Sequence, residues 1–386
     1  MLQAQPLACN RTQHYPSVST RGLIYCGTAC EASGGATRSK GFRVRIRTVL
    51  VSALAVALLA WFLQHADLAD VWGQVLEARL DFLFVGFLLV VVTFVIRAHR
   101  WQYLLRPIGP TRFRTAFRTT VIGAAALGVL PARAGDLLRP YLLARQEGLS
   151  TSATFATIVM ERVLDLIAML VLLAVYVWGT ADSSRLPESL RQGIEVSAAV
   201  AGVASVMLVG LTWVMATHPE RVGRLVFRAA GMLPHAMADR LSGYARTFSA
   251  GFAVAREPQA LAAALAWSFF LWLVIAGEAW LVALAFGIYM PFAGSFLLQA
   301  LLTIGVAVPT PGGVGSYHEA YRIGVTTFFG AANDAAVAAA LVTHMISYVP
   351  VVLAGVIFMA QDGLSFGRLP PLSAPEVSEK GTPPQS

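Results

Sequence analysis

Hydrophobic positions run in long, nearly unbroken blocks along most of this chain. A helix needs about 20 consecutive apolar residues to cross the roughly 30 Å hydrocarbon core of a bilayer. Six blocks reach or approach that length, so the pattern predicts an all-α fold, a polytopic membrane helix bundle with about six full spans. The six blocks are 48–64, 81–96, 153–178, 194–216, 259–287 and 335–359.

Two shorter apolar blocks, 115–131 and 292–308, each run straight into a cluster of Pro, Gly and charged residues. Cytoplasmic loops carry the excess of Lys and Arg in membrane proteins. If 115–131 crossed fully, the basic segments 132–152 and 217–258 would lie outside. If it enters and returns, every basic segment lies inside. We therefore expect two re-entrant or broken helices in a multi-pass protein of the cell (inner) membrane, with both termini cytoplasmic.

Composition supports the membrane assignment and limits the alternatives. Charged residues make up 13% of the 386 residues and the mean hydropathy is +0.64, whereas soluble domains carry about 25% charged residues. The net charge of +8 is typical of loops that face anionic lipid, and no nucleic-acid-binding motif is present. The three cysteines, Cys9, Cys26 and Cys30, have no accompanying ligand cluster, so we expect neither a metal nor another cofactor.

A polar, Gly/Ser/Thr-rich N-terminal segment and a Pro/Ser-rich C-terminal segment predict three regions. Residues 1–40 are expected to be a disordered extension, 41–360 the transmembrane domain and 361–386 a disordered tail. The segment 217–258 places apolar residues among arginines, which predicts either an amphipathic helix on the cytoplasmic surface or a connector packed on other loops.

The sequences LPARAGDLLRPY (130–141) and TPGGVGSYHEAYRIG (310–324) resemble each other. Three full crossings between them would make the second unit inverted, as in transporters that bind substrate at broken helices near the bilayer midplane. Chance similarity is the alternative. The spacing of three between acid and arginine predicts a pair on one helical face in each unit. The matching positions are Pro131 and Pro311, Gly135 and Gly315, Asp136 and Glu319, and Arg139 and Arg322.

The Gly/Pro-rich turn at 309–315 ends where a helix is expected to open near Ser316. Its backbone N–H groups are candidates for anion binding, and the alternative is a simple turn outside the membrane. His344, in the last block, is expected to be a satisfied core residue, and Glu278 to pair with a cluster arginine or to lie near the outer surface.

Charged residues also occur inside the block 153–178, in TIVMERVLDLIAMLVLL. Glu161 and Asp165 share a helical face, which is unfavourable unless a cation such as Arg133, Arg139 or Arg162 lies close. They either neutralise the arginines of the first cluster, leaving one arginine for a ligand, or mark a helix end at the interface. Arg97, Arg100 and Trp101 close the block 81–96 and predict an interfacial belt, with phosphate headgroup contact by an arginine as the alternative.

These motifs together resemble the lysylphosphatidylglycerol synthase membrane-domain family, also called the UPF0104 or flippase-like family. The resemblance covers about 45–360 and rests on R..RW..LL, LPARAGDLLRPYLLARQEGLS, ERVLD and PTPGGVGSYHEA. It implies a membrane region that translocates a lipid made by a separate catalytic domain, and too few residues follow the last block for such a domain. Asp136 departs from the family's usual Glu.

The expected function is therefore lipid translocation between leaflets, without enzyme activity and without an ATPase motif. The expected cargo is an anionic or aminoacyl phospholipid or another envelope lipid, and nucleic acid is excluded as a partner. A lipid synthase and a second copy of the chain are candidate partners. The expected substrate-binding residues are Arg133, Asp136, Arg139, Glu161, Arg162, Asp165, Pro311, Gly312, Gly313, Gly315, Glu319 and Arg322.

Two alternatives stay open at this point. One is a membrane-embedded transferase acting on a lipid-linked substrate, with Glu319 or Asp136 as general base and His318 as its partner. The other is an accessory scaffold for a lipid synthase.

Overall fold

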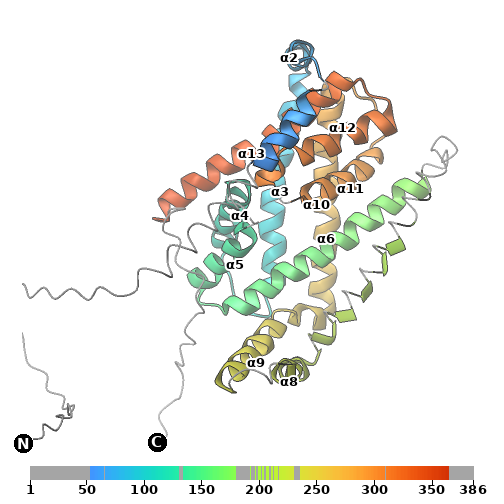
Figure 1. Ribbon diagram of the computed structural model, residues 1–386. Coiled ribbons are helices and arrows are strands. Elements are labelled where there is room, and N and C mark those ends of the chain that lie inside the picture. Colours follow the sequence, from blue (N-terminus) through green and yellow to red (C-terminus); the bar gives the residue numbers. More distant parts are fainter. Residues whose placement is uncertain are drawn as a thin grey trace, which may run out of the picture. The chain divides into compact units, whose positions relative to one another are not determined.

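The computed structural model describes residues 53–64, 66–129, 134–179, 218–229, 235–308 and 310–364, with scattered residues between 192 and 217. Every regular element in these ranges is a helix, as expected (Figure 1). The predicted disordered extension 1–40, most of the block 194–216, and Pro131 and Arg133 lie outside the described residues.

Three described helices are long and apolar enough to cross a membrane: α3 (Leu80–Leu105), α10 (Pro258–Ala285) and α13 (Asn333–Gln361). A fourth span results if Ala53–Leu63 and α2 (Leu68–Glu77), which meet at 82°, are counted together. The block 153–178 forms the 29-residue helix α6 (Thr151–Gly179). The expected count of about six full spans is therefore not confirmed within the described ranges.

Local capping and pairing define two further features of the fold, one of which corrects a predicted boundary. Between the first two apolar blocks the chain forms α2, because Asp67 caps that helix by accepting a 2.8 Å hydrogen bond from the Ala69 N–H. The predicted start of the tail at residue 361 is corrected, because α13 extends through Gln361 and Asp362 accepts a 2.6 Å hydrogen bond from Arg118. The rest of that predicted tail, 365–386, lies outside the described residues.

Helices α3 and α10 form an antiparallel pair at close approach. A Cβ atom built on Gly86 would lie 3.4 Å from the side chain of Val282, and one on Gly277 would lie 3.4 Å from Leu89. Small residues at such points allow membrane helices to pack closely. These contacts fix the register of the pair, so residues that face each other along it can be assigned.

Helices α4 (Phe113–Val129) and α5 (Ala134–Glu147) form the first helical hairpin. A Cβ on Gly135 would lie 2.1 Å from the Gly123 carbonyl oxygen, and a Cβ on Gly123 would lie 2.7 Å from the Arg139 Cβ. The two backbones are thus in antiparallel contact. Helix α5 therefore runs back along α4 after Val129, as the short length of the block 115–131 predicts.

The variant Gly135→Ala tests this packing. A methyl group has no room at 2.1 Å from a backbone oxygen, so we expect a loss of at least about 2 kcal/mol in the free energy of unfolding. Thermal unfolding of the purified protein in detergent measures the effect. The matched control is Gly73→Ala in α2, where no atom lies within 4 Å of an added Cβ, and where alanine stabilises a helix by about 0.5–1 kcal/mol. Equal behaviour of the two variants would contradict the hairpin packing.

Helices α11 (Gly294–Ala307) and α12 (Ser316–Phe329) form the second hairpin. A Cβ on Gly305 would lie 2.8 Å from the Ser316 carbonyl oxygen, and one on Gly294 would lie 2.8 Å from Phe329. The connecting loop contains the short helix η4 (Pro311–Gly313) and three glycines at positive φ. Only glycine adopts that backbone region without strain.

The two hairpins lie end to end along α13. Contacts of the first hairpin occupy the C-terminal half of α13, and contacts of the second occupy its N-terminal half. The tips meet near Tyr348, at the middle of α13, where the Gly312 Cα is close enough that a Cβ there would lie 3.4 Å from the Gly128 carbonyl oxygen. In order along α13, the contacts are Arg322 with Asn333, Gly312 with His344, Gly128 with Tyr348, and Arg118 with Asp362.

The segment 217–258 forms α8 (Pro219–Ala229), α9 (His235–Ala250) and the short helix η3 (Ala253–Arg256). Arg246 and Glu220 join α9 to α8 through a 3.3 Å ion pair. Leu225 and Met237 are exposed beside the basic residues. This pattern is compatible with the expected helices at a membrane surface, and that location stays a prediction.

Candidate functional site

Arg100 on α3 is fully buried and binds two carboxylates of α6. Its Nη2 lies 3.2 Å from Glu161 Oε1 and 3.3 Å from Asp165 Oδ2, and its Nη1 also donates to Asp165. The same Nη1 donates a 2.8 Å hydrogen bond to Ser268 Oγ on α10. Arg100 therefore ties three helices together inside the protein.

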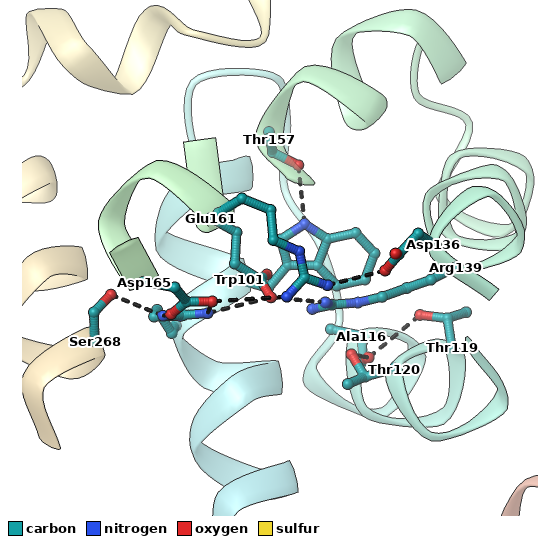
Figure 2. A network of polar contacts seen from close by, with 12 residues as sticks. Trp101, Ala116, Thr119, Thr120, Asp136, Arg139, Thr157, Glu161, Asp165 and Ser268 are labelled. Atoms are coloured by element: carbon teal, nitrogen blue, oxygen red, sulfur yellow. Dashed lines mark hydrogen bonds and ion pairs between the residues drawn. The ribbon is translucent and has the colours of Figure 1, made fainter. Parts of the chain in front are cut away.

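Arg139, near the start of α5, enters the same cluster from the first hairpin. Its Nη1 donates a 3.0 Å hydrogen bond to Glu161 Oε1, and its guanidinium lies 4.0 Å from the centre of the Trp101 ring. The Trp101 indole N–H donates in turn to Thr157 Oγ1 at 2.9 Å. Figure 2 shows Arg139, Trp101 and Glu161 converging at the centre of this network.

Arg162 completes the cluster on its more open side. It donates a 2.9 Å hydrogen bond to Asp136 Oδ1 and lies 3.9 Å from Asp165 Oδ2. Asp136 and Arg139 therefore bind partners on α6 instead of each other, and the predicted pairing within the first unit is wrong. The helix-end interpretation of Glu161 is also wrong, because its side chain is 0% exposed. We call this set the arginine network: Arg100, Arg139, Arg162, Asp136, Glu161 and Asp165.

The predicted interfacial belt is corrected for two of its three members. Arg100 and Trp101 are both 0% exposed, so neither contacts a bilayer interface or a headgroup outside the protein. The spacing of Thr93, Arg97 and Arg100 on one face of α3 was the signal that these polar residues point inward.

A cavity of about 350 Å³ lies where the two hairpin tips meet. Helices α3, α4, α5, α6, α10 and α13, together with the loop of the second hairpin, contribute to its walls. Polar and charged side chains from all these elements face it, while Val90, Leu127, Ile275 and Val351 are among its apolar lining. The polar lining side chains are Thr93, Arg97, Thr120, Asp136, Arg139, Arg162, Glu278, Thr310, Ser347 and Tyr348.

The end of the cavity nearest the arginine network has more cations than acids among the described residues. Four arginines, with Arg97 added to the network's three, face the three acids of the network. In the described part of the chain, Arg97 forms no ion pair and donates no hydrogen bond. Arg139, which is 7% exposed, has no partner for Nε or Nη2. Arg97 therefore offers unused guanidinium donors to an anion at this wall, while the unpaired Nε and Nη2 of Arg139 are buried within the protein.

The second hairpin contributes only part of the set expected from the sequence. Gly312 and Gly313 line the cavity, but Pro311 does not. Gly315 packs against helix Ala53–Leu63, where a Cβ would lie 2.4 Å from Leu58 Cβ. The cavity therefore supports the predicted substrate-binding role of Gly312 and Gly313, but not that of Pro311 and Gly315.

Glu319 and Arg322 form the predicted pair at spacing three, with Arg322 Nε donating to Glu319 Oε2 at 2.9 Å. Arg322 also donates to Asn333 at the N-terminal end of α13. Neither Glu319 nor Arg322 lines the cavity. This cavity gives no support to their predicted role in substrate binding, because α12 runs away from the tip and carries them toward the far end of α13.

The loop N–H groups expected to bind an anion are already used. Gly313, Val314 and Gly315 donate to Thr310 O, Pro311 O and His318 Nδ1 respectively. That interpretation of the Gly/Pro-rich turn is therefore wrong for these three groups.

A buried histidine pair fixes the shape of this loop. The Gly315 N–H requires His318 Nδ1 to accept, so His318 Nε2 carries the proton that it donates to His344 Nδ1 at 2.9 Å. His344 Nε2 then donates to the Gly312 carbonyl oxygen at 3.0 Å. Both rings are satisfied as neutral imidazoles, which confirms the expectation for His344. His318 lies beside the cavity wall as a positioning residue and does not reach the cavity.

Glu278 is the cavity residue that the sequence assigned least clearly. It neither pairs with an arginine nor lies on the outer surface. It is 5% exposed, lines the cavity and accepts a 3.2 Å hydrogen bond from Ser347 Oγ. Within the described residues, no group of three His, Cys, Asp or Glu side chains is arranged to hold a metal ion.

Comparison with known proteins places these features in a family. The family model described as "Lysylphosphatidylglycerol synthase TM region" matches residues 48–355. Glycosyltransferase AglD of Haloferax volcanii is 26% identical over 334 residues, which cover 80% of this chain and 53% of that protein. A UPF0104 membrane protein of Methanothermobacter thermautotrophicus is 23% identical over 337 residues, covering 81% of this chain and 92% of its own length.

The chain thus spans about half the length of AglD. The expectation that this chain is not an enzyme is overturned by that comparison, because a protein that matches most of the chain is named a glycosyltransferase. Membrane-length helices and a relative named as a membrane protein together identify a multi-pass membrane protein.

Proposed function

This chain belongs to the family of the lysylphosphatidylglycerol synthase TM region, and from that premise we propose that it acts in group transfer on a lipid-linked substrate. The phosphate of that lipid binds in the cavity between the hairpin tips. The transferred group is a sugar, the class of chemistry that the name of the relative AglD indicates.

The observation that supports phosphate binding is the set of unused guanidinium donors. Arg97 has no partner among the described residues, and Arg139 Nε and Nη2 are buried without one. A guanidinium binds phosphate oxygens through two parallel hydrogen bonds. An uncompensated cation inside a membrane protein is costly and is therefore a mark of a functional site. A bound phosphate supplies the missing negative charge.

The size of the cavity limits what enters it. At about 350 Å³, it lies at the lower end of the range for small-molecule pockets, roughly 300–1,000 Å³. It accommodates a phosphate and a small attached group, so the hydrocarbon chains of the lipid must stay outside. This volume therefore favours a lipid whose headgroup binds inside the protein while its hydrocarbon chains stay in the bilayer.

The transfer step needs a group that accepts a proton and a wall that stabilises the leaving phosphate. The anomeric C–O bond to the lipid phosphate breaks, and its electron pair stays on the phosphate facing Arg97 and Arg139. A hydroxyl of the acceptor forms the new C–O bond and loses its proton to a carboxylate. Among the described residues, the carboxylates that line the cavity are Asp136 and Glu278. Asp136 is one of the two bases expected from the sequence, and Glu278 takes the place of the other, Glu319.

The variant Arg97→Ala tests the proposal. Loss of one charge-assisted contact of about 1.5–3 kcal/mol corresponds to roughly 10–150-fold weaker binding. We expect that loss for decyl phosphate, measured by calorimetry on detergent-solubilised protein, and a parallel loss of sugar transfer from a radiolabelled polyprenyl phosphate sugar. Because Arg97 has no ion pair to break, the unfolding temperature should fall little.

The matched control is Arg106→Ala, at the end of the same helix. Arg106 is exposed and stacks 4.2 Å from the centre of the Tyr103 ring, so phosphate binding should be retained. The site would be contradicted if Arg97→Ala and Arg106→Ala lost the same affinity for decyl phosphate. It would also be contradicted if Arg97→Ala bound decyl phosphate as tightly as the wild type. Binding without any transfer product would contradict the enzyme part alone.

Translocation of the lipid is the second candidate, and one observation favours it. The hairpins enter from opposite ends of α13 and meet at its middle, an arrangement like the broken helices at the substrate sites of transporters. Reconstituted vesicles with a fluorescent lipid and dithionite quenching measure leaflet exchange. Exchange above that of empty vesicles, lost in Arg97→Ala, would support translocation at this same site.

A further inference from the structure

The register of α3 and α10 places Glu278 far from the cationic end of the same cavity. Gly86 faces Val282, and Arg100 binds Ser268, so Arg97 is level with about Leu271. Glu278 lies about two helical turns further along α10, roughly 11 Å along the axis. The cavity therefore has a cationic end and an acidic end.

Glu278 is built as an acceptor that faces the cavity. Its side chain is 95% buried, and Ser347 Oγ holds Oε1 at 3.2 Å. No arginine binds it, and Oε2 accepts no hydrogen bond from any residue in the described ranges. Buried carboxyl groups are normally paired or hydrogen-bonded. Oε2 therefore remains available to accept a hydrogen bond from a group that enters this end of the cavity.

We propose that Glu278 and Ser347 form a second subsite that binds a hydrogen-bond-donating substituent on the lipid phosphate. The hydroxyl groups of a sugar and an ammonium group share this chemistry. The substrate class is then a phosphodiester with such a substituent, and a bare phosphate monoester is a poorer ligand. This inference rests on the proposed function, because the phosphate must first occupy the Arg97 end.

The two subsites are compatible in distance. Arg97 and Glu278 both line the cavity. Side chains lean toward the N-terminus of their own helix, so in this antiparallel pair the two side chains lean toward each other along the axis. One sugar ring or a short amino alcohol spans the remaining gap. The apolar residues between them, including Val90 and Ile275, suit the carbon face of such a group.

Binding of three soluble probes to the purified full chain tests the subsite. The probes are decyl phosphate, decyl phosphoglucose and decyl phosphoethanolamine. We expect the wild type to bind at least one of the two diesters about tenfold or more tightly than decyl phosphate, because each hydrogen bond to a charged group contributes about that factor. In Glu278→Gln this preference should fall to about twofold, and decyl phosphate should bind more tightly because an acid has left the cavity.

Two further variants provide a control and a second test of the subsite. Glu319→Gln removes a carboxylate that lies outside the cavity and should keep the wild-type preference. Ser347→Ala removes only the hydroxyl that orients Glu278 and should lower the preference about threefold. It supplies the test if Glu278→Gln does not fold.

The outcomes separate the two proposals. If decyl phosphate does not bind, or binds independently of Arg97, the proposed function itself fails. Suppose that binding of decyl phosphate requires Arg97, but Glu278→Gln and Ser347→Ala keep the wild-type preference for the diesters. Only the second subsite is then overturned. A change confined to decyl phosphoglucose identifies hydroxyl recognition, and one confined to decyl phosphoethanolamine identifies ammonium recognition.

Discussion

Replacing Glu161 with glutamine is expected to lower the free energy of unfolding by about 3–5 kcal/mol. Glu161 Oε1 lies 3.2 Å from Arg100 and 3.0 Å from Arg139, and all three side chains are at least nine-tenths buried. Removal of its charge leaves Arg139 without any ion pair and Arg100 with Asp165 alone. Two cations in a low-dielectric interior then repel each other with too few acids to offset them.

Thermal unfolding of the detergent-solubilised protein measures this loss as a fall in the unfolding temperature. The matched control is Asp81→Asn, whose partner Arg79 lies at 2.7 Å with both side chains 60% exposed. Water screens an exposed pair of this kind, so the control should change little. The double variant Arg139→Gln with Glu161→Gln should recover part of the stability, since the excess cation is removed as well. Similar shifts for Glu161→Gln and Asp81→Asn would contradict a buried network.

The sequence predicted the helices of this fold better than it predicted which side chains pair between them. Long apolar blocks indicated α3, α6, α10 and α13, and the short blocks that ran into Pro and Gly indicated the two hairpins. Residue spacing correctly paired Glu319 with Arg322, because both lie on one turn of the same helix and form their ion pair there. It failed for Asp136 and Arg139, because α6 brings Glu161 and Arg162 to them from outside the helix.

The cavity could not be predicted because it depends on contacts between distant segments. Arg100 and Trp101 resembled an interfacial belt at the end of an apolar block, yet α6 and the first hairpin cover both. Glu278 became interpretable only when the α3–α10 register placed it opposite the Arg97 end. The spacing of polar residues on the inner face of α3 was visible, but its partners were not.

The middle of α13 is expected to combine a water-filled cavity on one face with hydrocarbon on the other. Ser347 lines the cavity, whereas Met345, two residues away at nearly the same depth, is 61% exposed on the outer face. A charged thiol reagent reaches bilayer-centred positions with difficulty, since a charge there costs about 2.5–3.5 kcal/mol. That cost corresponds to a rate difference on the order of 100-fold.

The measurement uses single-cysteine variants, Ser347→Cys and Met345→Cys, in a background in which Cys9, Cys26 and Cys30 are changed to serine. Each protein is reconstituted into vesicles and treated with a charged methanethiosulfonate. We expect Ser347→Cys to react about 100-fold faster than Met345→Cys, and decyl phosphate to slow its reaction. Fast, unprotected labelling of Met345→Cys with an unreactive Ser347→Cys would contradict a phosphate-binding cavity between hairpin tips inside the membrane.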